Sequence, residues 1–193
     1  MSRKLVVVTG PSGAGKGTLL SELVERMPEL EVAVSATTRE RRPGERDGRE
    51  YYFLTDEEFD RRVLAGEFLE YVAYVSGHRY GTLLGELDRI RANGRVPVLE
   101  LETDGAVEVA RKVPGSLTVF VDAPSFAELE RRLRERATES AGEIGERLAL
   151  ARRQREQADL FEYAVVNDDL DRAVEEVAGI VRRELTAAGT MLS

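Results

Sequence analysis

The sequence contains no cysteine and no tryptophan, and His78 is its single histidine. Without cysteine the chain can form no disulfide, no thiolate nucleophile and no cysteine-ligated metal site, and one histidine cannot form a histidine cluster. Basic residues are also too few to outweigh the acidic ones, since 28 Lys and Arg face 36 Asp and Glu for a formal net charge of -8. These features exclude zinc and thiol redox chemistry and argue against nucleic acid as a partner, because a surface that displaces counterions from nucleic acid is basic.

Long apolar runs are missing as well. The residues Met1 to Lys4 lead into only four apolar residues, at 5–8, which are too few for a signal-peptide core or a membrane span. We therefore predict a cytoplasmic protein without membrane contact. Its 193 residues, with 42% hydrophobic and 33% charged side chains, are typical of one globular domain that buries a sizeable core.

Strands and helices alternate along much of the chain, which predicts an α/β fold. The β-branched run at 5–8 is typical of a strand buried on both faces, and the apolar residues from Leu19 to Met27 recur at helical spacing before Pro28. The pattern returns with strands at 96–101, 117–121 and 163–166, helices at 104–113 and from 125 onward, and a last helix that Asn167 is expected to cap. Strands separated by helices predict right-handed crossovers and a parallel sheet flanked by helices.

Two stretches interrupt this alternation. Residues 35–82 are polar, turn-rich and strand-like, with one helix that Thr55 and Glu58 are expected to open as a capping box. We interpret them as an inserted β-rich subdomain. Residues 137–156 are rich in Arg and Glu and poor in large apolar side chains, which favours a mobile helical lid.

A glycine-rich segment lies between the first strand and the first helix, the context that a P-loop requires. Its glycines let backbone N–H groups converge on phosphate oxygens, and the helix N-terminus adds positive charge. Lys16, one of only three lysines, supplies a mobile cation. The predicted triphosphate-binding residues are Gly10, Pro11, Ser12, Gly13, Ala14, Gly15, Lys16, Gly17 and Thr18. The alternative is a tight turn that binds nothing.

The residue after the P-loop lysine differs from the common pattern. A Ser or Thr that ligates Mg²⁺ usually stands there, whereas this chain has Gly17 followed by Thr18. Nucleoside monophosphate kinases often carry the Lys-Gly-Thr form. Thr18 is therefore the candidate metal ligand.

A second motif, Ser35-Ala-Thr-Thr-Arg39-Glu-Arg-Arg42-Pro-Gly-Glu45, follows the expected second strand, with Tyr51-Tyr-Phe53 after it. Arg39 and Arg42 carry forked donors that can hold one phosphate, and the Tyr51 and Tyr80 hydroxyls can add to them. A solvated charge run is the alternative, which we favour for the other arginines of the stretch, Arg41, Arg46 and Arg49.

In this motif the sequence resembles the guanylate kinase family, whose Ser-x-Thr-Thr-Arg-x-x-Arg-x-Gly-Glu stretch binds the GMP phosphate. The resemblance covers nearly the whole chain, with further matches at 68–70, 80–82, 136–140, 147–148 and 166–170. It implies one domain over 1–193, with a P-loop core at 1–34 and 95–193, a GMP-binding insertion at 35–94 and the lid at 137–156. The implied reaction is in-line phosphoryl transfer from ATP to GMP, and also to dGMP, with Mg²⁺ as cofactor.

The resemblance also implies roles for particular residues. The GMP site would comprise Ser35, Arg39, Arg42, Tyr51, Glu70, Tyr80, Thr82 and Glu102. Glu70 would accept hydrogen bonds from guanine N1–H and the exocyclic amine, which adenine does not offer, while Ser35 and Thr82 would bond O6. Taken alone, Glu70 in an alternating strand is expected to be an exposed polar residue. The stretch from Glu70 to Tyr80 is one residue longer than the family spacing.

Glu102 lies within a segment, Glu100-Leu-Glu-Thr-Asp-Gly105, where the family has Asp-x-Asp-x-Gln-Gly. Carboxylates at the end of a parallel strand lie in the ligand crevice of such sheets. Glu102 could therefore reach the guanine amine or a magnesium-bound water, and a solvent-facing glutamate is the alternative. The changed segment leaves room for another monophosphate acceptor.

Lid arginines are implied at Arg132, Arg136 and Arg147, which would close over the triphosphate. The implied catalytic residues are then Lys16, Arg39, Arg42, Arg132, Arg136 and Arg147. Arg131 and Arg134 alternate with Glu130 and Glu135, which favours helix-surface pairing for them. Asn167 matches a family position near the adenine of ATP.

Two other functions compete with this hypothesis. One is a related P-loop small-molecule kinase such as a ribose 1,5-bisphosphate phosphokinase, against which Thr37-Thr38-Arg39 and Glu70 argue. The other is a non-catalytic guanylate-kinase-like module that binds phosphopeptides, against which Lys16 and its glycines argue. ATP and GMP are the expected partners, and a homo-oligomer remains open.

Overall fold

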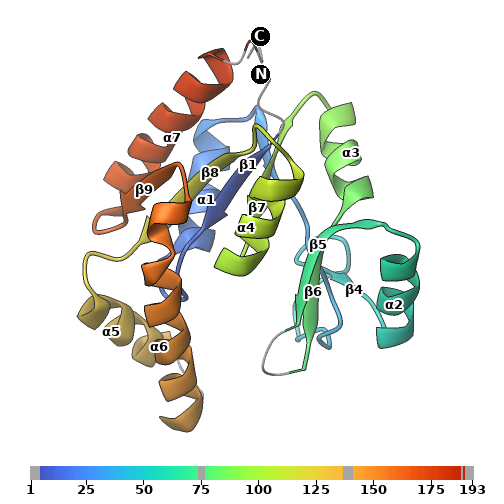
Figure 1. Ribbon diagram of the computed structural model, residues 1–193, viewed down its shortest axis with the longest axis horizontal. Coiled ribbons are helices and arrows are strands. Elements are labelled where there is room, and N and C mark those ends of the chain that lie inside the picture. The colour runs from blue at the N-terminus through green and yellow to red at the C-terminus, as the bar shows by residue number, and fades with distance from the viewer. Residues whose placement is uncertain (1–4, 74–76, 137–140, 188, 190–193) are drawn as a thin grey trace.

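A five-stranded parallel sheet forms the centre of the molecule (Figure 1). The computed structural model describes residues 5–73, 77–136, 141–187 and 189. The strands are β1 (Val6–Thr9), β2 (Leu30–Val32), β7 (Val96–Glu100), β8 (Leu117–Asp122) and β9 (Tyr163–Val166), in the order β2-β7-β1-β8-β9. β1 lies in the middle with its valines fully buried, because helices cover both faces of the sheet. The predicted parallel α/β sheet is thereby confirmed.

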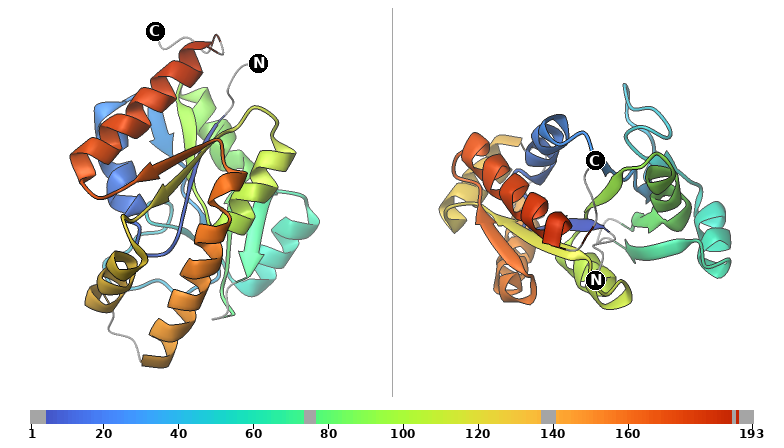
Figure 2. Two further views of the ribbon diagram at one scale, coloured as in Figure 1. Left: turned by 60° about the vertical axis from the view of Figure 1, so that its left-hand side comes forward. Right: turned by 90° about the horizontal axis from the view of Figure 1, so that it is seen from above.

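Helices pack on both faces of this sheet (Figure 2). On one face, α1 (Lys16–Arg26) and α7 (Leu170–Ala187) bury an apolar cluster that includes Leu19, Leu23, Val174 and Val177. On the other face, α3 (Leu84–Ala92) and α4 (Thr103–Lys112) contribute Leu87, Ile90 and Val109. Each fully buried side chain of this size contributes about 1.5–3 kcal/mol. The sheet and helices therefore form a rigid base for the loops at the strand ends.

A second sheet of four strands lies beyond β2 and β7 and is built from residues 36–83. Its strands are β3 (Ala36–Thr37), β4 (Tyr52–Phe53), β5 (Phe68–Ala73) and β6 (Arg79–Leu83), in the order β4-β3-β6-β5. α2 (Asp56–Leu64) stacks Phe59 on Phe68 with ring centroids 4.4 Å apart. Thr55 Oγ1 accepts a bond from the Glu58 N–H at 3.1 Å, as expected of an N-cap, while the Glu58 carboxylate pairs with Arg62.

α5 (Phe126–Arg136), α6 (Ala141–Glu156) and a short 3₁₀ turn η1 (Ala158–Leu160) follow β8. In Figure 1, α5 and α6 lie on one side and the four-stranded sheet on the other, both toward the end where the parallel strands finish. The start of the predicted lid, 137–140, lies outside the described residues, and the rest of it, 141–156, is α6. No helix in the described part of the chain is long and apolar enough to span a membrane.

The expectation that Asn167 caps the last helix is wrong. α7 begins at Leu170, and Asp169 Oδ1 accepts a bond from the Arg172 N–H at 2.9 Å, three residues further on. Such a bond is the mark of an N-cap. Asn167 is instead buried, with its side-chain amide turned toward the glycine-rich loop.

Candidate active site

The loop between β1 and α1 needs glycine at two positions. Gly10 has φ +142°, and a Cβ there would lie 1.9 Å from the carbonyl oxygen of Val121 on the neighbouring strand. Gly15 has φ +86°, and a Cβ there would lie 2.6 Å from Asn167 Nδ2. The loop can therefore pass close to β8 and to Asn167 only because these side chains are absent.

Lys16 folds back over this loop. Its Nζ donates to the carbonyl oxygens of Gly10 at 2.7 Å and Pro11 at 3.1 Å, and the residue is only 8% exposed. The ammonium group is thus held at the mouth of the loop, where a phosphate bound by the loop would meet it.

Glu100 lies beside the loop, although the sequence-based prediction favoured Glu102. It ends β7 in register with Val8 of β1, and its carboxylate oxygen lies 3.6 Å from the place that a Cβ of Gly17 would occupy. Although the residue as a whole is exposed at the strand end, desolvation of its carboxylate raises the pKa of Glu100, and the charge of Lys16 partly offsets that rise. The charge of Lys16, at the start of α1, therefore favours the ionised form of this carboxylate at the end of β7.

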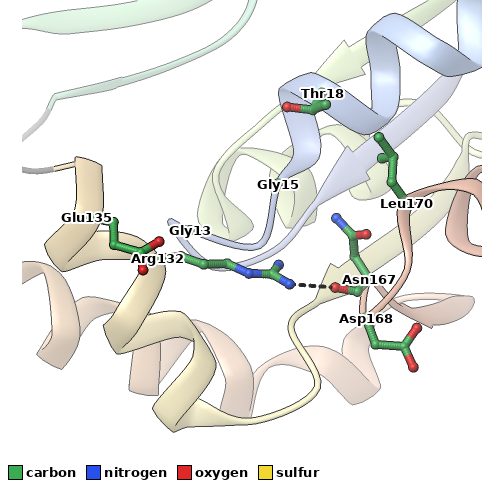
Figure 3. A pocket seen from close by; sticks show the side chains of 8 residues that line it. All are labelled: Gly13, Gly15, Thr18, Arg132, Glu135, Asn167, Asp168 and Leu170. Carbon is green, nitrogen blue, oxygen red and sulfur yellow. Dashed lines mark hydrogen bonds between the residues drawn. The ribbon is translucent and has the colours of Figure 1, made fainter.

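An open pocket of about 360 Å³ adjoins the loop (Figure 3). Asn167 Nδ2 donates to the Ala14 carbonyl oxygen at 2.8 Å, and Arg132 Nη2 donates to the Asn167 carbonyl oxygen at 3.1 Å. The pocket brings together predicted residues from three separate parts of the sequence. It is lined by Gly13, Gly15, Thr18, Arg132, Glu135, Asn167, Asp168 and Leu170.

Glu128 holds Arg132 from the other side. Arg132 Nε donates to Glu128 Oε1 at 2.8 Å, and Arg131 bonds the same carboxylate. Hydrogen bonds from these two arginines lower the pKa of Glu128 to about 2. Arg131 also pairs with Glu135, so the predicted helix-surface pairing of Arg131 is confirmed.

α6 contacts both the loop and the strand ends. Arg147 Nη2 donates to Ser12 Oγ at 3.0 Å, which places one predicted lid arginine against the loop. Gln154 Nε2 bonds the carboxylate of Glu102, and Arg155 Nε donates to Asp122 Oδ2 at 2.7 Å. Glu102 is therefore not the solvent-facing glutamate of the alternative interpretation. The side chain of Arg136, the remaining lid arginine, lies outside the described part of the chain.

The four-stranded sheet carries a second polar cluster. Arg39 Nη2 donates to both carboxylate oxygens of Glu45, at 2.8 and 3.0 Å, and its guanidinium lies over the Tyr51 ring. The Tyr51 and Tyr80 rings meet edge to face at 5.8 Å. Arg42 is exposed and joins this cluster through its backbone N–H, which donates to Glu45 at 2.8 Å. The structure thus places Arg39 and the backbone of Arg42 on Glu45, with Tyr51 beside Arg39 and Tyr80 beside Tyr51.

Glu70 is buried, so the expectation of an exposed residue in an alternating strand is wrong. It is 2% exposed, Oε1 accepts from Thr82 Oγ1 at 2.8 Å, and Oε2 lies 3.0 Å from where a Cβ of Gly105 would be. Burial raises the pKa of Glu70, and the bonds from Thr82 partly offset this rise. The carboxylate lies against Gly105 of α4, and the register of β5 is irregular between Phe68 and Glu70, so simple alternation does not give the side that Glu70 faces.

The sequence profile of the guanylate kinase family matches residues 2–184. The chain belongs to the guanylate kinase family. A guanylate kinase of Rubrobacter xylanophilus is 47% identical over 180 residues, which are 93% of this chain and 94% of that protein. One of Thermotoga maritima is 42% identical over 184 residues, 95% and 88% of the two chains. The crystal structure of the guanylate kinase from Anaplasma phagocytophilum, 28% identical, superposes with a TM-score of 0.76 over 95% of this chain and 87% of that one.

Proposed function

We propose that this chain transfers the terminal phosphoryl group of ATP to GMP, giving ADP and GDP, with dGMP as a second acceptor. The observation that carries the proposal is the pairing of two sites at one end of the molecule. One is a glycine loop crossed by Lys16, and the other is an arginine and tyrosine cluster beside the buried Glu70. Family membership and the relatives' shared name support the same reaction.

On the donor side, the loop amides and Lys16 would bind the β- and γ-phosphates. Arg147 already contacts Ser12 of the loop, and Arg132 is oriented by Glu128 and the Asn167 carbonyl. These guanidinium groups would neutralise the charge that develops on the transferring phosphoryl group. The adenine would occupy the pocket beside Asn167.

On the acceptor side, Arg39, Tyr51 and Tyr80 would hold the GMP phosphate, with Arg42 joining from the exposed turn. Arg39 is held by Glu45, whose bonds raise the pKa of Arg39, so the guanidinium is charged and oriented before the ligand binds. Glu70 and Thr82 form the pair that would read the guanine edge. A buried carboxylate rejects adenine because its lone pairs would stay unsatisfied.

The residues at the loop suit a magnesium ion. Mg²⁺ keeps several of its waters and needs one or two protein oxygens together with the substrate phosphates, rather than a cage of carboxylates. The exposed Thr18 hydroxyl and the Glu100 carboxylate offer such oxygens beside Lys16. When bound, the ion would neutralise negative charge on the phosphates of the donor.

The two competing functions have less support. The relatives that match over nearly the full length are named guanylate kinases, and neither a sugar-phosphate kinase nor a scaffold needs the buried Glu70 and Thr82 pair. A phosphopeptide-binding module would also have no use for an ordered lysine over the loop.

A coupled ADP-release assay with a panel of nucleoside monophosphates tests the proposal. We expect turnover with GMP and dGMP and little with AMP, CMP or UMP. Lys16→Ala should lower kcat/KM by at least about 10²-fold, since one such charge-stabilising contact is worth about 2.7–4 kcal/mol. Arg111→Ala, which removes an exposed cation on α4, is the control and should behave as wild type. Normal turnover in Lys16→Ala, or no activity with GMP in the wild type, would contradict the proposal.

A further inference from the structure

The two sheets are joined by the chain at two places. Residues 33–35 lead from β2 of the five-stranded sheet to β3 of the four-stranded sheet, and α3 leads back from β6 to β7. The donor loop belongs to the first sheet and the arginine and tyrosine cluster to the second. The angle at these two connections therefore sets how the acceptor meets the donor.

Glu86 lies in the second connection, in the first turn of α3, and it bonds both the first connection and the four-stranded sheet. Its Oε1 accepts from the Val34 N–H at 3.0 Å, and its Oε2 accepts from the Tyr52 hydroxyl at 2.9 Å. Val34 lies in the first connection, Glu86 in the second, and Tyr52 on β4 of the four-stranded sheet. One carboxylate thus ties the two connections to each other and to the acceptor sheet.

A charged network supports this carboxylate. Arg89 donates to Glu86 twice, through Nε to Oε2 and through Nη2 to Oε1, both at 2.8 Å. Arg89 also bonds Glu31 of β2, and Arg95 reaches the same Glu31 at 2.9 Å. Burial raises the pKa of Glu86, but the bonds from Arg89, the Val34 N–H and Tyr52 outweigh it and leave the pKa lowered. Glu86 is therefore ionised although it is only 3% exposed.

The residues that Glu86 bonds are sequence neighbours of two predicted acceptor residues. Val34 precedes Ser35, and Tyr52 follows Tyr51. The Tyr52 N–H also donates to the Ser35 carbonyl oxygen at 2.9 Å, so the two strands that Glu86 holds are bonded to each other at this point. A movement of the carboxylate would shift both acceptor residues through the backbone.

We infer that Glu86 is a positioning residue for the acceptor, which fixes the four-stranded sheet against the donor site through Val34 and Tyr52. A buried ion pair contributes little net stability. The position of the Glu86 and Arg89 pair at the connections between the sheets is therefore better explained by the alignment of the two sheets that it provides. The inference rests on the proposed function. Wild-type turnover tests that function by itself, and the variants below test only the role of Glu86.

Glu86→Ala should raise the KM for GMP about tenfold and lower kcat, because the loss of a hydrogen bond to a charged group corresponds to a factor of about ten in an equilibrium constant. The KM for ATP should change less than about twofold, because the partners of Glu86, which are Val34, Tyr52 and Arg89, are not residues of the donor loop. Tyr52→Phe removes the hydroxyl that bonds the same charged carboxylate from β4 and should raise the KM for GMP by up to about tenfold. Asp88→Ala, an exposed acidic neighbour on α3, is the matched control and should leave both constants unchanged.

Steady-state kinetics with each substrate varied, together with melting temperatures, decide the question. Glu86→Gln keeps one acceptor oxygen and the side-chain volume, so it and Tyr52→Phe provide the test if Glu86→Ala does not fold. A rise in the KM for GMP without a matching rise in the KM for ATP supports the inference, provided that the Tyr52→Phe effect is absent in the Glu86→Ala background or reduced in the Glu86→Gln background. Parallel rises in both KM values, or unchanged constants in a folded Glu86 variant, would overturn it.

Discussion

Replacing Glu70 with glutamine should weaken catalysis and improve stability at the same time. The Glu70→Gln side chain keeps its volume and an oxygen for the Thr82 hydroxyl, which now bonds Glu70 at 2.8 Å. What it loses is the negative charge and the second accepting oxygen. The guanine N1–H and amine would then face an amide N–H group, so that donors oppose donors.

The size of the catalytic effect follows from the hydrogen bonds lost. A bond to a charged group is worth about 1.5–3 kcal/mol, and about 1.4 kcal/mol corresponds to a factor of ten. Loss of one such bond should therefore lower kcat/KM for GMP by about 10- to 10²-fold. The KM for ATP should stay within about twofold, because Glu70 lies on the acceptor sheet.

The stability effect has the opposite sign. Burial raises the pKa of Glu70 in the folded protein, so ionising it costs stability. The cost begins as pH rises past the pKa of the unfolded chain and is complete above the raised folded pKa. Glu70→Gln removes this cost, so its melting temperature should exceed that of the wild type by more at pH 8 than at pH 5.

Coupled ADP-release kinetics and thermal melts at the two pH values measure both effects. Glu57→Gln, which neutralises an exposed glutamate on α2, is the control for the loss of one charge. Wild-type kcat/KM for GMP in Glu70→Gln would refute the reasoning about base recognition. A melting temperature that falls at pH 8 would refute the reasoning about burial.

Two further substitutions test the frame around the site. Gly10→Ala should destabilise the fold by about 3 kcal/mol or more, because its Cβ would lie 1.9 Å from the Val121 carbonyl oxygen at a φ of +142°. Chemical denaturation measures this loss, and an unfolding midpoint equal to that of the wild type would contradict the prediction. Asp169→Ala removes the N-cap of α7 and should cost about 1 kcal/mol, or about 2–4 °C in melting temperature. Asn167→Ala offers the comparison, since our sequence-based expectation placed the cap there. A larger loss of stability in Asn167→Ala than in Asp169→Ala, with normal ATP binding, would indicate that Asn167 and not Asp169 caps α7.

The parallel core was predictable because its signals are local. A β-branched run, a glycine loop and apolar residues at helical spacing follow one another within the first 27 residues, and the later strands repeat the pattern. α3 was not predicted, because it is short and only Leu87 and Ile90 on its surface are apolar and buried. Such a helix is recognised only once the sheet that it covers is known.

The sequence indicated which types of residue form the site, but it did not indicate which side chains contact one another. Asn167, Asp168 and Asp169 can each cap a helix, and only the position where α7 begins decides among them. Glu102 was preferred to Glu100, but β7 ends at Glu100, so strand alternation no longer gives the direction of the Glu102 side chain. The Glu86 bonds span 52 and 34 residues of sequence, and a local sequence pattern does not predict contacts between residues so far apart.

An acidic chain that binds two polyanions must keep its cations in fixed places. With a net charge of -8, the average field of the protein repels ATP and GMP. Arg39 is held by Glu45 and Arg132 by Glu128, so each guanidinium is oriented before a phosphate arrives. A paired arginine has donors beyond those its carboxylate uses, and orienting it in advance removes the entropy cost of ordering a long side chain on binding. The carboxylates beside these arginines therefore favour phosphate recognition through geometry, although they reduce the local positive charge.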